Sequence, residues 1–203
     1  MLKDAPMVKY LLVANAAIYL LTLVMPGIFY GFFALHNFES DRYNPIQFLT
    51  YQFLHSPGPL HIIFNMMLLF VFGVFVEWSY GSRKFLLAYL LCGVAGGLLH
   101  NATLPEEMVI AHLIKGDDVT LIGASGSVWG MLATFALIRP NDRLNIFFLP
   151  VGVKSKWLIL TFFVVEVLSA LLIYDNISHY AHIGGAVAGV VFYIGYGLHS
   201  GRS

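Results

Sequence analysis

Long runs of apolar residues, separated by short polar segments, make up most of this chain. Six such runs cover residues 10–25, 59–76, 85–99, 119–138, 157–173 and 180–198. A helix of about 20 apolar residues crosses the hydrocarbon core of a bilayer, and these runs are too long and too continuous for strands. The pattern predicts an all-α membrane protein, a bundle of six transmembrane helices that forms a single domain over residues 1–203.

The composition supports a membrane setting. Hydrophobic residues make up 59% of the chain, charged residues make up 11%, and the mean hydropathy is +0.78. Soluble domains carry about 25% charged residues, so we do not expect one here. Lys3 and Lys9 precede the first run, as in a secretory signal, but no Ala-x-Ala cleavage site follows it. We therefore expect the first helix to be retained.

The basic residues are distributed unevenly between the two ends of the predicted helices. Two of the eleven, Arg42 and Lys115, fall on one side. The others fall on the opposite side: Lys3, Lys9, Arg83, Lys84, Arg139, Arg143, Lys154, Lys156 and Arg202. Because cytoplasmic loops carry the excess of Lys and Arg, both termini should be cytoplasmic. We expect a multi-pass protein of a bacterial inner membrane.

Four polar side chains lie near the beginnings of the three runs that enter from the non-cytoplasmic face. If the fourth helix starts near Thr120, Ser125 lies ~7.5 Å below its entry point, at a rise of ~1.5 Å per residue, and His182 lies just inside the last run. His61 and Asn65 are one turn apart in the second run. Polar groups inside a membrane are costly and face the bundle interior or a cavity. This layer is therefore the candidate active site, and it should open to the non-cytoplasmic side.

Two G-x-x-x-G pairs, at residues 126–130 and 185–189, indicate which helices touch. Such pairs let two backbones approach closely, and in many membrane proteins they serve packing alone. Here each pair lies beside one of the polar residues, Ser125 and His182. This placement favours a serine–histidine hydrogen bond between the fourth and sixth helices.

The chemistry that fits this pair is nucleophilic attack on a carbonyl. Ser125 is the candidate nucleophile, and a neutral His182, with an ordinary pKa of ~6.5, is the candidate base. Gly123 beside the serine leaves room for a peptide carbonyl. Ser127 lies roughly 200° around the helix from Ser125, so only one of the two can face the histidine. The neighbouring glycines favour Ser125.

Hydrolysis also needs hydrogen-bond donors for the oxyanion. The candidate donors are His61, Asn65 and the backbone amide of Ser125, assisted by the positive N-terminal end of the helix predicted at 119–138. We expect three residues to cap that end: Asp117, Asp118 and Thr120.

No acidic residue is expected near His182 at a matching depth, so the sequence predicts a Ser–His dyad rather than a triad. Glu166 falls near the middle of the fifth run, and this depth favours a packing role. His179 could share a metal ion with His182 and His61, but there is no H-E-x-x-H motif and no third clear ligand, so we expect no metal and no cofactor. Three further histidines in or near outer loops are expected to be solvated: His55, His100 and His112.

Together these residues resemble the rhomboid family of intramembrane serine proteases, in its minimal six-span form. The resemblance covers nearly the whole chain, with three motifs in order on the second, fourth and sixth runs, and Glu77 and Gly81 after the second. The motifs are His61-Ile62-Ile63-Phe64-Asn65, Gly123-Ala124-Ser125-Gly126, and Ala181-His182 followed by Gly185 and Gly189. The resemblance implies cleavage of single-pass membrane proteins in or near their transmembrane segment, after a small residue and without a cofactor.

The resemblance also implies roles for other residues. Trp129, four residues after the serine, would stack on the histidine, and residues 157–174 with their outer loop would gate substrate entry. Many relatives carry a Trp-Arg pair in the first outer loop. Here Arg42-Tyr43 is the nearest pair, and Ile46-Gln47 holds the corresponding place. The role of this loop stays open.

Two other functions also stay open. A catalytically silent rhomboid-like protein would bind transmembrane helices with the same bundle, although the presence of both Ser125 and His182 argues against it. A small transporter would need polar residues that reach both faces, whereas only Glu166 lies deeper than the outer third. The expected partners are transmembrane protein substrates and the lipid bilayer, with no nucleic acid. The sequence does not indicate an oligomeric state.

Overall fold

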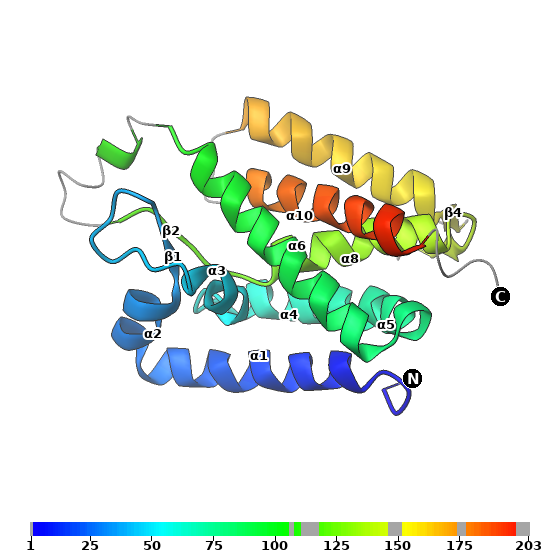
Figure 1. Cartoon of the computed structure of the whole chain (residues 1–203), viewed down its shortest axis with the longest axis horizontal. Helices are drawn as coiled ribbons and strands as arrows, with labels where there is room; N and C mark the ends of the chain where they lie inside the picture. Colours follow the sequence, from blue (N-terminus) through cyan, green and yellow to red (C-terminus); the bar gives the residue numbers. More distant parts are fainter. Residues whose placement is uncertain (1, 106–107, 111–117, 146–151, 174–177, 198–203) are drawn as a thin grey trace.

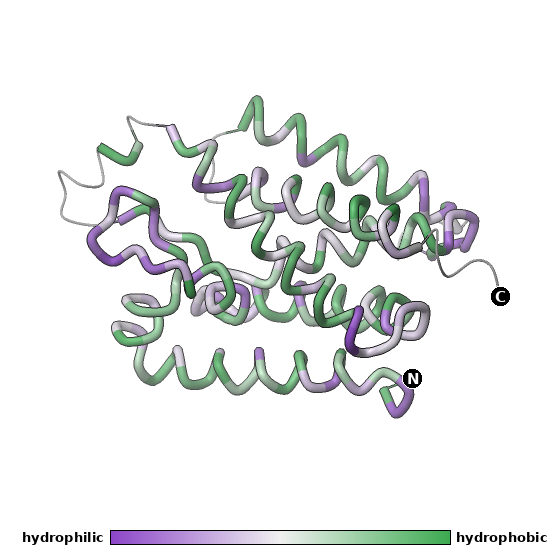
Figure 2. Tube along the Cα trace, in the orientation of Figure 1, coloured by the Kyte–Doolittle hydropathy of each residue, from purple (hydrophilic) through white to green (hydrophobic). Residues whose placement is uncertain are grey.

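Helices run lengthwise through the molecule, with one of them tilted across the others (Figure 1). The structure, a computed structural model, describes residues 2–105, 108–110, 118–145, 152–173 and 178–197. The apolar runs form α1 (Pro6–Val24), α4 (Pro59–Leu68) continued by η2 (Leu69–Gly73) and α5 (Val74–Tyr80), the tilted α6 (Ser82–Ala102), α8 (Ser125–Ile138), α9 (Ser155–Leu172), and α10 (His179–Phe192) continued by η3 (Tyr193–Gly197). Figure 2 shows hydrophobic residues along the helices and hydrophilic residues mainly in the connections at the two ends.

Within the described residues, four helical stretches are long and apolar enough to cross a membrane. They are residues 6–24, 59–80, 82–102 and 155–172. Helices α8 and α10 contain 14 residues each, fewer than the ~20 that a full crossing takes. The prediction of a helical membrane protein is confirmed, whereas the number of six crossings stays a prediction.

The predicted start of the fourth helix is wrong. Helix α8 begins at Ser125, not at Val119. Before it, β2 (Thr120–Leu121) pairs antiparallel with β1 (Leu35–His36), and Gly123 follows with a φ of +125°, a conformation that favours glycine. Pairing with a distant strand, together with this glycine, keeps an apolar segment out of the helix. Hydrophobicity alone does not reveal such a contact.

The first outer loop is held together by one buried glutamine. The loop contains α2 (Pro26–Phe33), β1, α3 (Gln47–Thr50) and η1 (Tyr51–Phe53). The side-chain oxygen of Gln47 accepts from the backbone N–H groups of His36 (3.3 Å) and Asn44 (3.1 Å). Its amide nitrogen donates to the carbonyls of Phe32 (3.3 Å) and Arg42 (2.9 Å). Gln47 thus connects four separate points of the loop, which gives this position a structural role.

Glu77 fastens the first helix to the rest of the bundle. Its two carboxylate oxygens accept from the backbone N–H groups of Met7 (2.9 Å) and Val8 (2.8 Å) in the first turn of α1, and the Ser82 hydroxyl donates to it at 2.5 Å. The first N–H groups of a helix have no partner inside it, and the N-terminal end is positive. The buried carboxylate therefore supplies both the acceptors and the charge that this helix end needs.

The centre of the bundle is a glycine-lined contact of α8 and α10, with α6 beside them. A Cβ at Gly185 would overlap the backbone carbonyl of Gly126, and a Cβ at Gly189 would overlap that of Gly130. The close contact predicted from the two G-x-x-x-G pairs is confirmed. Helix α6 joins it through Gly96, where a Cβ would lie 2.6 Å from the Ala181 carbonyl oxygen, a contact that the sequence reasoning did not predict.

The connection between α8 and α9 lies at the opposite end of the molecule from β1 and β2 (Figure 1). It includes β3 (Arg143–Leu144) paired antiparallel with β4 (Val153–Lys154). Ser155 then anchors the start of α9, because its backbone N–H donates to the Asp142 carbonyl at 2.8 Å and its hydroxyl donates to the Arg139 carbonyl.

Candidate active site

Ser125 is the first residue of α8, and the segment before it brings the serine well into the bundle. Figure 1 shows this segment running lengthwise from β2 to the start of α8. An extended residue advances about 3.3 Å, whereas a helical residue advances about 1.5 Å. Ser125 therefore lies further from the outer loops than the ~7.5 Å that a helix beginning near Thr120 would give.

The serine and the histidine meet across the contact of α8 and α10. Ser125 Oγ lies 2.9 Å from His182 Nε2, within hydrogen-bonding distance. Both side chains are partly buried. If the hydroxyl donates, Nε2 is the unprotonated nitrogen and the neutral ring carries its proton on Nδ1.

The neighbouring serine points elsewhere. Ser127 is buried, and its hydroxyl donates to Gln52 Oε1 at 2.9 Å. The expected division of the two serines between different faces of the helix is therefore present, with Ser125 on the side of the histidine.

His61 approaches the serine from α4. The Ser56 backbone N–H donates to His61 Nδ1 at 3.3 Å, so a neutral His61 carries its proton on Nε2. A Cβ placed on Gly123 would lie 2.8 Å from His61 Nε2 and 3.7 Å from Ser125 Oγ. An N–H donor and the serine hydroxyl thus border one small space, which glycine keeps open.

Asn65 and Trp129 are the two remaining predicted site residues. Asn65 is buried, and its amide donates to the His61 carbonyl at 2.8 Å. Within the described residues it makes no hydrogen bond to Ser125 or His182. The Trp129 ring stacks on His182, with centroids 5.6 Å apart and planes 25° from parallel. The stacking that the resemblance implies is present.

The start of α8 is not capped by a side chain. Ala124 holds the N-cap position, and the Val128 N–H donates to its carbonyl at 3.0 Å. Asp118 was expected to cap this helix, but it pairs with His36 Nδ1 at 3.0 Å, because the segment there is a strand edge and not a helix end. Thr120 lies in β2, and Asp117 lies outside the described residues. The first N–H groups of α8, including that of Ser125, have no acceptor within the helix, so they can bind an anion beside the serine.

The prediction that no acid lies near His182 is wrong. Glu166 Oε2, on α9, is 3.0 Å from His182 Nδ1 and 2.6 Å from His179 Nδ1. The error follows from the predicted start of α8. That start placed Ser125 too near the outer surface, so Glu166 was expected to lie too deep to reach His182. The three side chains form a cluster of potential metal ligands, different from the one considered with His61. The two distances from Glu166 Oε2 to the imidazole nitrogens are those of hydrogen bonds.

The prediction that His55 is solvated is wrong, and His100 is partly buried. His55 is buried, and its ring lies edge-on to His61, with centroids 5.0 Å apart. Burial, with the charge of His61 as a second cause, lowers the pKa of His55 to about 4, so His55 is neutral near pH 7. His100 Nδ1 lies 2.7 Å from the Ser178 hydroxyl, and His112 lies outside the described residues. The neutral His55 ring packs against the candidate site without adding charge.

Comparison with known proteins identifies the family. The family model of the rhomboid domain matches residues 42–199. The chain belongs to the rhomboid family.

Several curated rhomboid proteins are similar to this chain. Rhomboid-like protein 11, chloroplastic, of Arabidopsis thaliana is 31% identical over 77% of this chain and 52% of its own length. Rhomboid protease AarA of Providencia stuartii is 28% identical over 70% of this chain and 53% of its own length. Rhomboid protease GluP of Bacillus subtilis is 28% identical over 65% of this chain and 22% of its own length. The chain thus spans about half the length, or less, of these rhomboid relatives.

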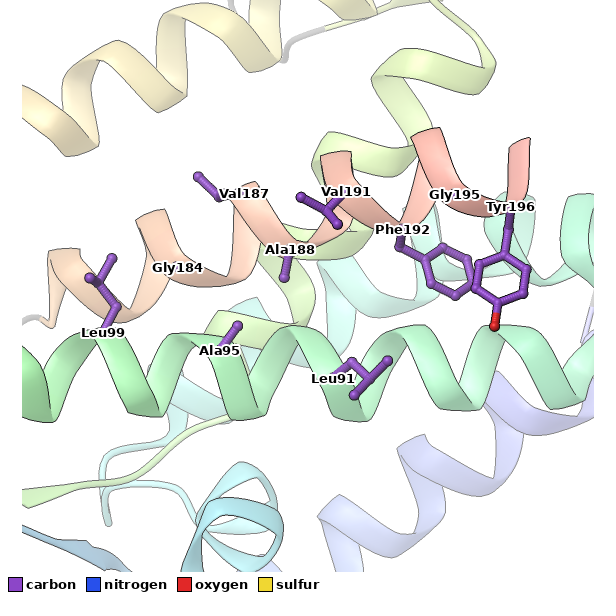
Figure 3. A pocket seen from close by; sticks show the side chains of 10 residues that line it. All are labelled: Leu91, Ala95, Leu99, Gly184, Val187, Ala188, Val191, Phe192, Gly195 and Tyr196. Carbon is purple, nitrogen blue, oxygen red and sulfur yellow. The ribbon is translucent and has the colours of Figure 1, made fainter. Parts of the chain in front are cut away.

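This rhomboid protein also has an apolar groove that Ser125 does not line. It has a volume of about 640 Å³ and lies between α6 and α10 (Figure 3). Apolar side chains such as Leu91, Val187 and Val191 line it, and it includes none of the predicted site residues. Its lining includes no serine, cysteine, histidine or carboxylate, so the candidate chemistry belongs to the Ser125 site.

Proposed function

We propose that this rhomboid protein is an intramembrane serine endopeptidase that cleaves single-pass membrane proteins in or near their transmembrane segment. The observation that carries the proposal is the 2.9 Å contact between Ser125 Oγ and His182 Nε2 at an uncapped helix start. The family adds support, since two of the similar proteins are named rhomboid proteases.

In the proposed reaction, His182 Nε2 takes the proton of the Ser125 hydroxyl as Oγ bonds to the carbonyl carbon of the scissile peptide. The carbonyl oxygen becomes an oxyanion and accepts hydrogen bonds from the Ser125 N–H and from His61 Nε2–H. The protonated His182 then gives its proton to the leaving nitrogen, and the C–N bond breaks. A water molecule, deprotonated by His182, hydrolyses the resulting ester and restores the serine.

Three neighbours have supporting roles in this proposal. Gly123 keeps open the space where the carbonyl must approach, because a side chain there would contact His61. Asn65 has a second amide N–H for the oxyanion or for a water molecule that bridges to it. Trp129 holds the plane of the His182 ring by stacking.

The proposed setting is a bilayer crossed six times by a single domain of residues 1–203, with cytoplasmic termini. In the structure, the start of α1, the α8–α9 connection and the end of α10 lie at one end of the molecule (Figure 1). That end carries most of the basic residues, and Arg42 lies in the loop at the other. The active site would then open to the non-cytoplasmic side. The similar proteins include bacterial, chloroplast and mitochondrial ones, so a bacterial inner membrane stays a prediction.

A serine-directed fluorophosphonate tests the proposal on the purified protein in detergent. We expect covalent labelling of the wild type, no labelling of Ser125→Ala or His182→Ala, and cleavage of a transmembrane reporter that is lost in the same variants. Ser79→Ala is the control, because this exposed serine lies on α5, away from the site. Labelling of Ser125→Ala at the wild-type rate would contradict the proposal. A folded wild type that neither reacts nor cleaves would instead indicate a silent relative that binds transmembrane helices.

A further inference from the structure

A carboxylate from a third helix lies against the candidate base. Glu166 lies on α9, whereas His179 and His182 lie one turn apart on α10 and so face the same side of that helix. Both Nδ1 atoms approach one oxygen, Glu166 Oε2, at 2.6 Å and 3.0 Å. The Glu166 side chain is 15% exposed and the two imidazoles are 10% and 13% exposed, so the cluster is largely shielded.

The placement of Glu166 needs a reason, because ionisable side chains inside transmembrane segments are costly. Apolar residues surround it in sequence, from Phe162 to Val165 and again at Val167 and Leu168. Packing alone would be served as well by leucine. Among the described residues, the polar groups within hydrogen-bonding distance of the carboxylate are the two imidazoles. The carboxylate of Glu166 therefore makes polar contacts with the two imidazoles and does not serve apolar packing.

The chemistry of the serine defines what this contact can do. For Nε2 of His182 to accept the serine proton, the neutral ring must carry its own proton on Nδ1, and Nδ1 is the atom that faces Glu166 Oε2. In the structure, His182 Nδ1 and Glu166 Oε2 are close enough for a hydrogen bond, but the angle at Nδ1 does not meet hydrogen-bond geometry. Catalytic hydrogen bonds are often poorly aligned without substrate and tighten when it binds.

Resting on the proposed function, we propose that Glu166 is a positioning residue for His182. Its carboxylate accepts the Nδ1 proton of His182, which holds the ring in the tautomer that leaves Nε2 free, and it stabilises the imidazolium that forms when Ser125 loses its proton. His179 Nδ1 donates to the same oxygen and keeps the carboxylate in place. The predicted dyad becomes a Ser–His–Glu arrangement assembled from α8, α10 and α9.

This arrangement makes the base depend on how α9 is docked. Helix α9 contacts α10 and α8, and it is the least buried of the long helices, with 17% of its most apolar stretch inside the protein. Glu166 reaches His182 only when α9 lies against α10.

The test compares Glu166→Gln with Glu166→Asp in the full-length protein. Glutamine keeps the size of the side chain but can present an amide N–H to Nδ1, which favours the wrong tautomer. We expect kcat for a transmembrane reporter to fall by about 10²-fold with KM unchanged, because Glu166 acts through His182 and does not touch the substrate. Aspartate keeps the charge and should restore part of kcat. Thr161→Val is the matched control, since Thr161 is exposed on the same helix and should leave kcat unchanged.

A second measurement does not depend on turnover. Nitrogen-15 NMR of the imidazoles distinguishes the two neutral tautomers, and we expect His182 to shift from the Nδ1–H form in the wild type toward the Nε2–H form in Glu166→Gln. A wild-type tautomer and wild-type kcat in Glu166→Gln would overturn this inference, while the loss of labelling in Ser125→Ala would still support the protease. A wild type without any activity would contradict the proposed function itself.

Discussion

The two sides of α10 pack against their neighbours by different means. Toward α8, glycines bring the two backbones together, so that a single added methyl group at Gly185 would overlap the Gly126 carbonyl. Toward α9, the contact depends on side chains, with Glu166 reaching two histidines from a helix that is mostly exposed. The first contact determines where Ser125 and His182 lie. The second determines, in our inference, how the His182 ring is turned.

This difference predicts opposite sensitivities. A backbone contact without free space should respond to added volume, even when no polar group changes. A side-chain contact at an exposed helix should tolerate changes in volume and respond to the loss of one charge. The predictions below test each side separately.

Gly185→Ala should have the largest effect. Its Cβ would lie 3.0 Å from Gly126 Cα and closer still to the carbonyl, and neither backbone atom can move without separating α8 from α10. A displacement of about 1 Å at a catalytic pair costs about 10²-fold, so we expect the labelling rate of Ser125 to fall by at least that factor and the Tm to fall as well. Gly27→Ala is the control, because nothing lies within 4 Å of a Cβ there. Wild-type labelling in Gly185→Ala would show that the helix contact does not set the distance.

The backbone contact is the part of the site that the sequence could predict. Glycine spacing is a local pattern, and it points to the helix faces that approach, so Ser125 and His182 could be paired from the residues beside them. The structure brings their Oγ and Nε2 atoms to 2.9 Å. The placement of Trp129 followed from its spacing after the serine, through the resemblance to rhomboid proteins.

The side-chain contact could not be predicted, because it depends on depth. Counting residues from Thr120 at a helical rise placed Ser125 too near the outer surface, and Glu166 was then judged too deep to reach His182. The pairing of β2 with β1, which sets the true start of α8, joins residues about 85 positions apart and leaves no local trace. A polar residue in the apolar α9 was the available signal, and it was read as packing.

Asn65→Ala should have an intermediate effect, because Asn65 lies on α4 and contributes to neither side of α10. We expect kcat to fall by ~10²-fold or less through weaker support of the oxyanion, with the Tm close to that of the wild type. Asn15→Ala is a matched control. Asn15 is also buried and donates to the carbonyl four residues earlier, at the same 2.8 Å, but it lies on α1 away from the serine. Equal losses of kcat in both variants would indicate a general structural effect and not an oxyanion role.

Leu168→Ala should have the smallest effect, and it separates the polar contact of α9 from its packing. Leu168 lies two residues after Glu166 but is 49% exposed, so truncation removes surface that faces lipid and not the bundle. We expect kcat to stay within about twofold of the wild type in nanodiscs, and the free energy of unfolding to change by at most ~0.5 kcal/mol. A tenfold loss of kcat would mean that the packing of α9, independent of its carboxylate, controls His182. In that case both sides of α10 would obey the same rule, and the contrast between a backbone contact and a side-chain contact would no longer hold.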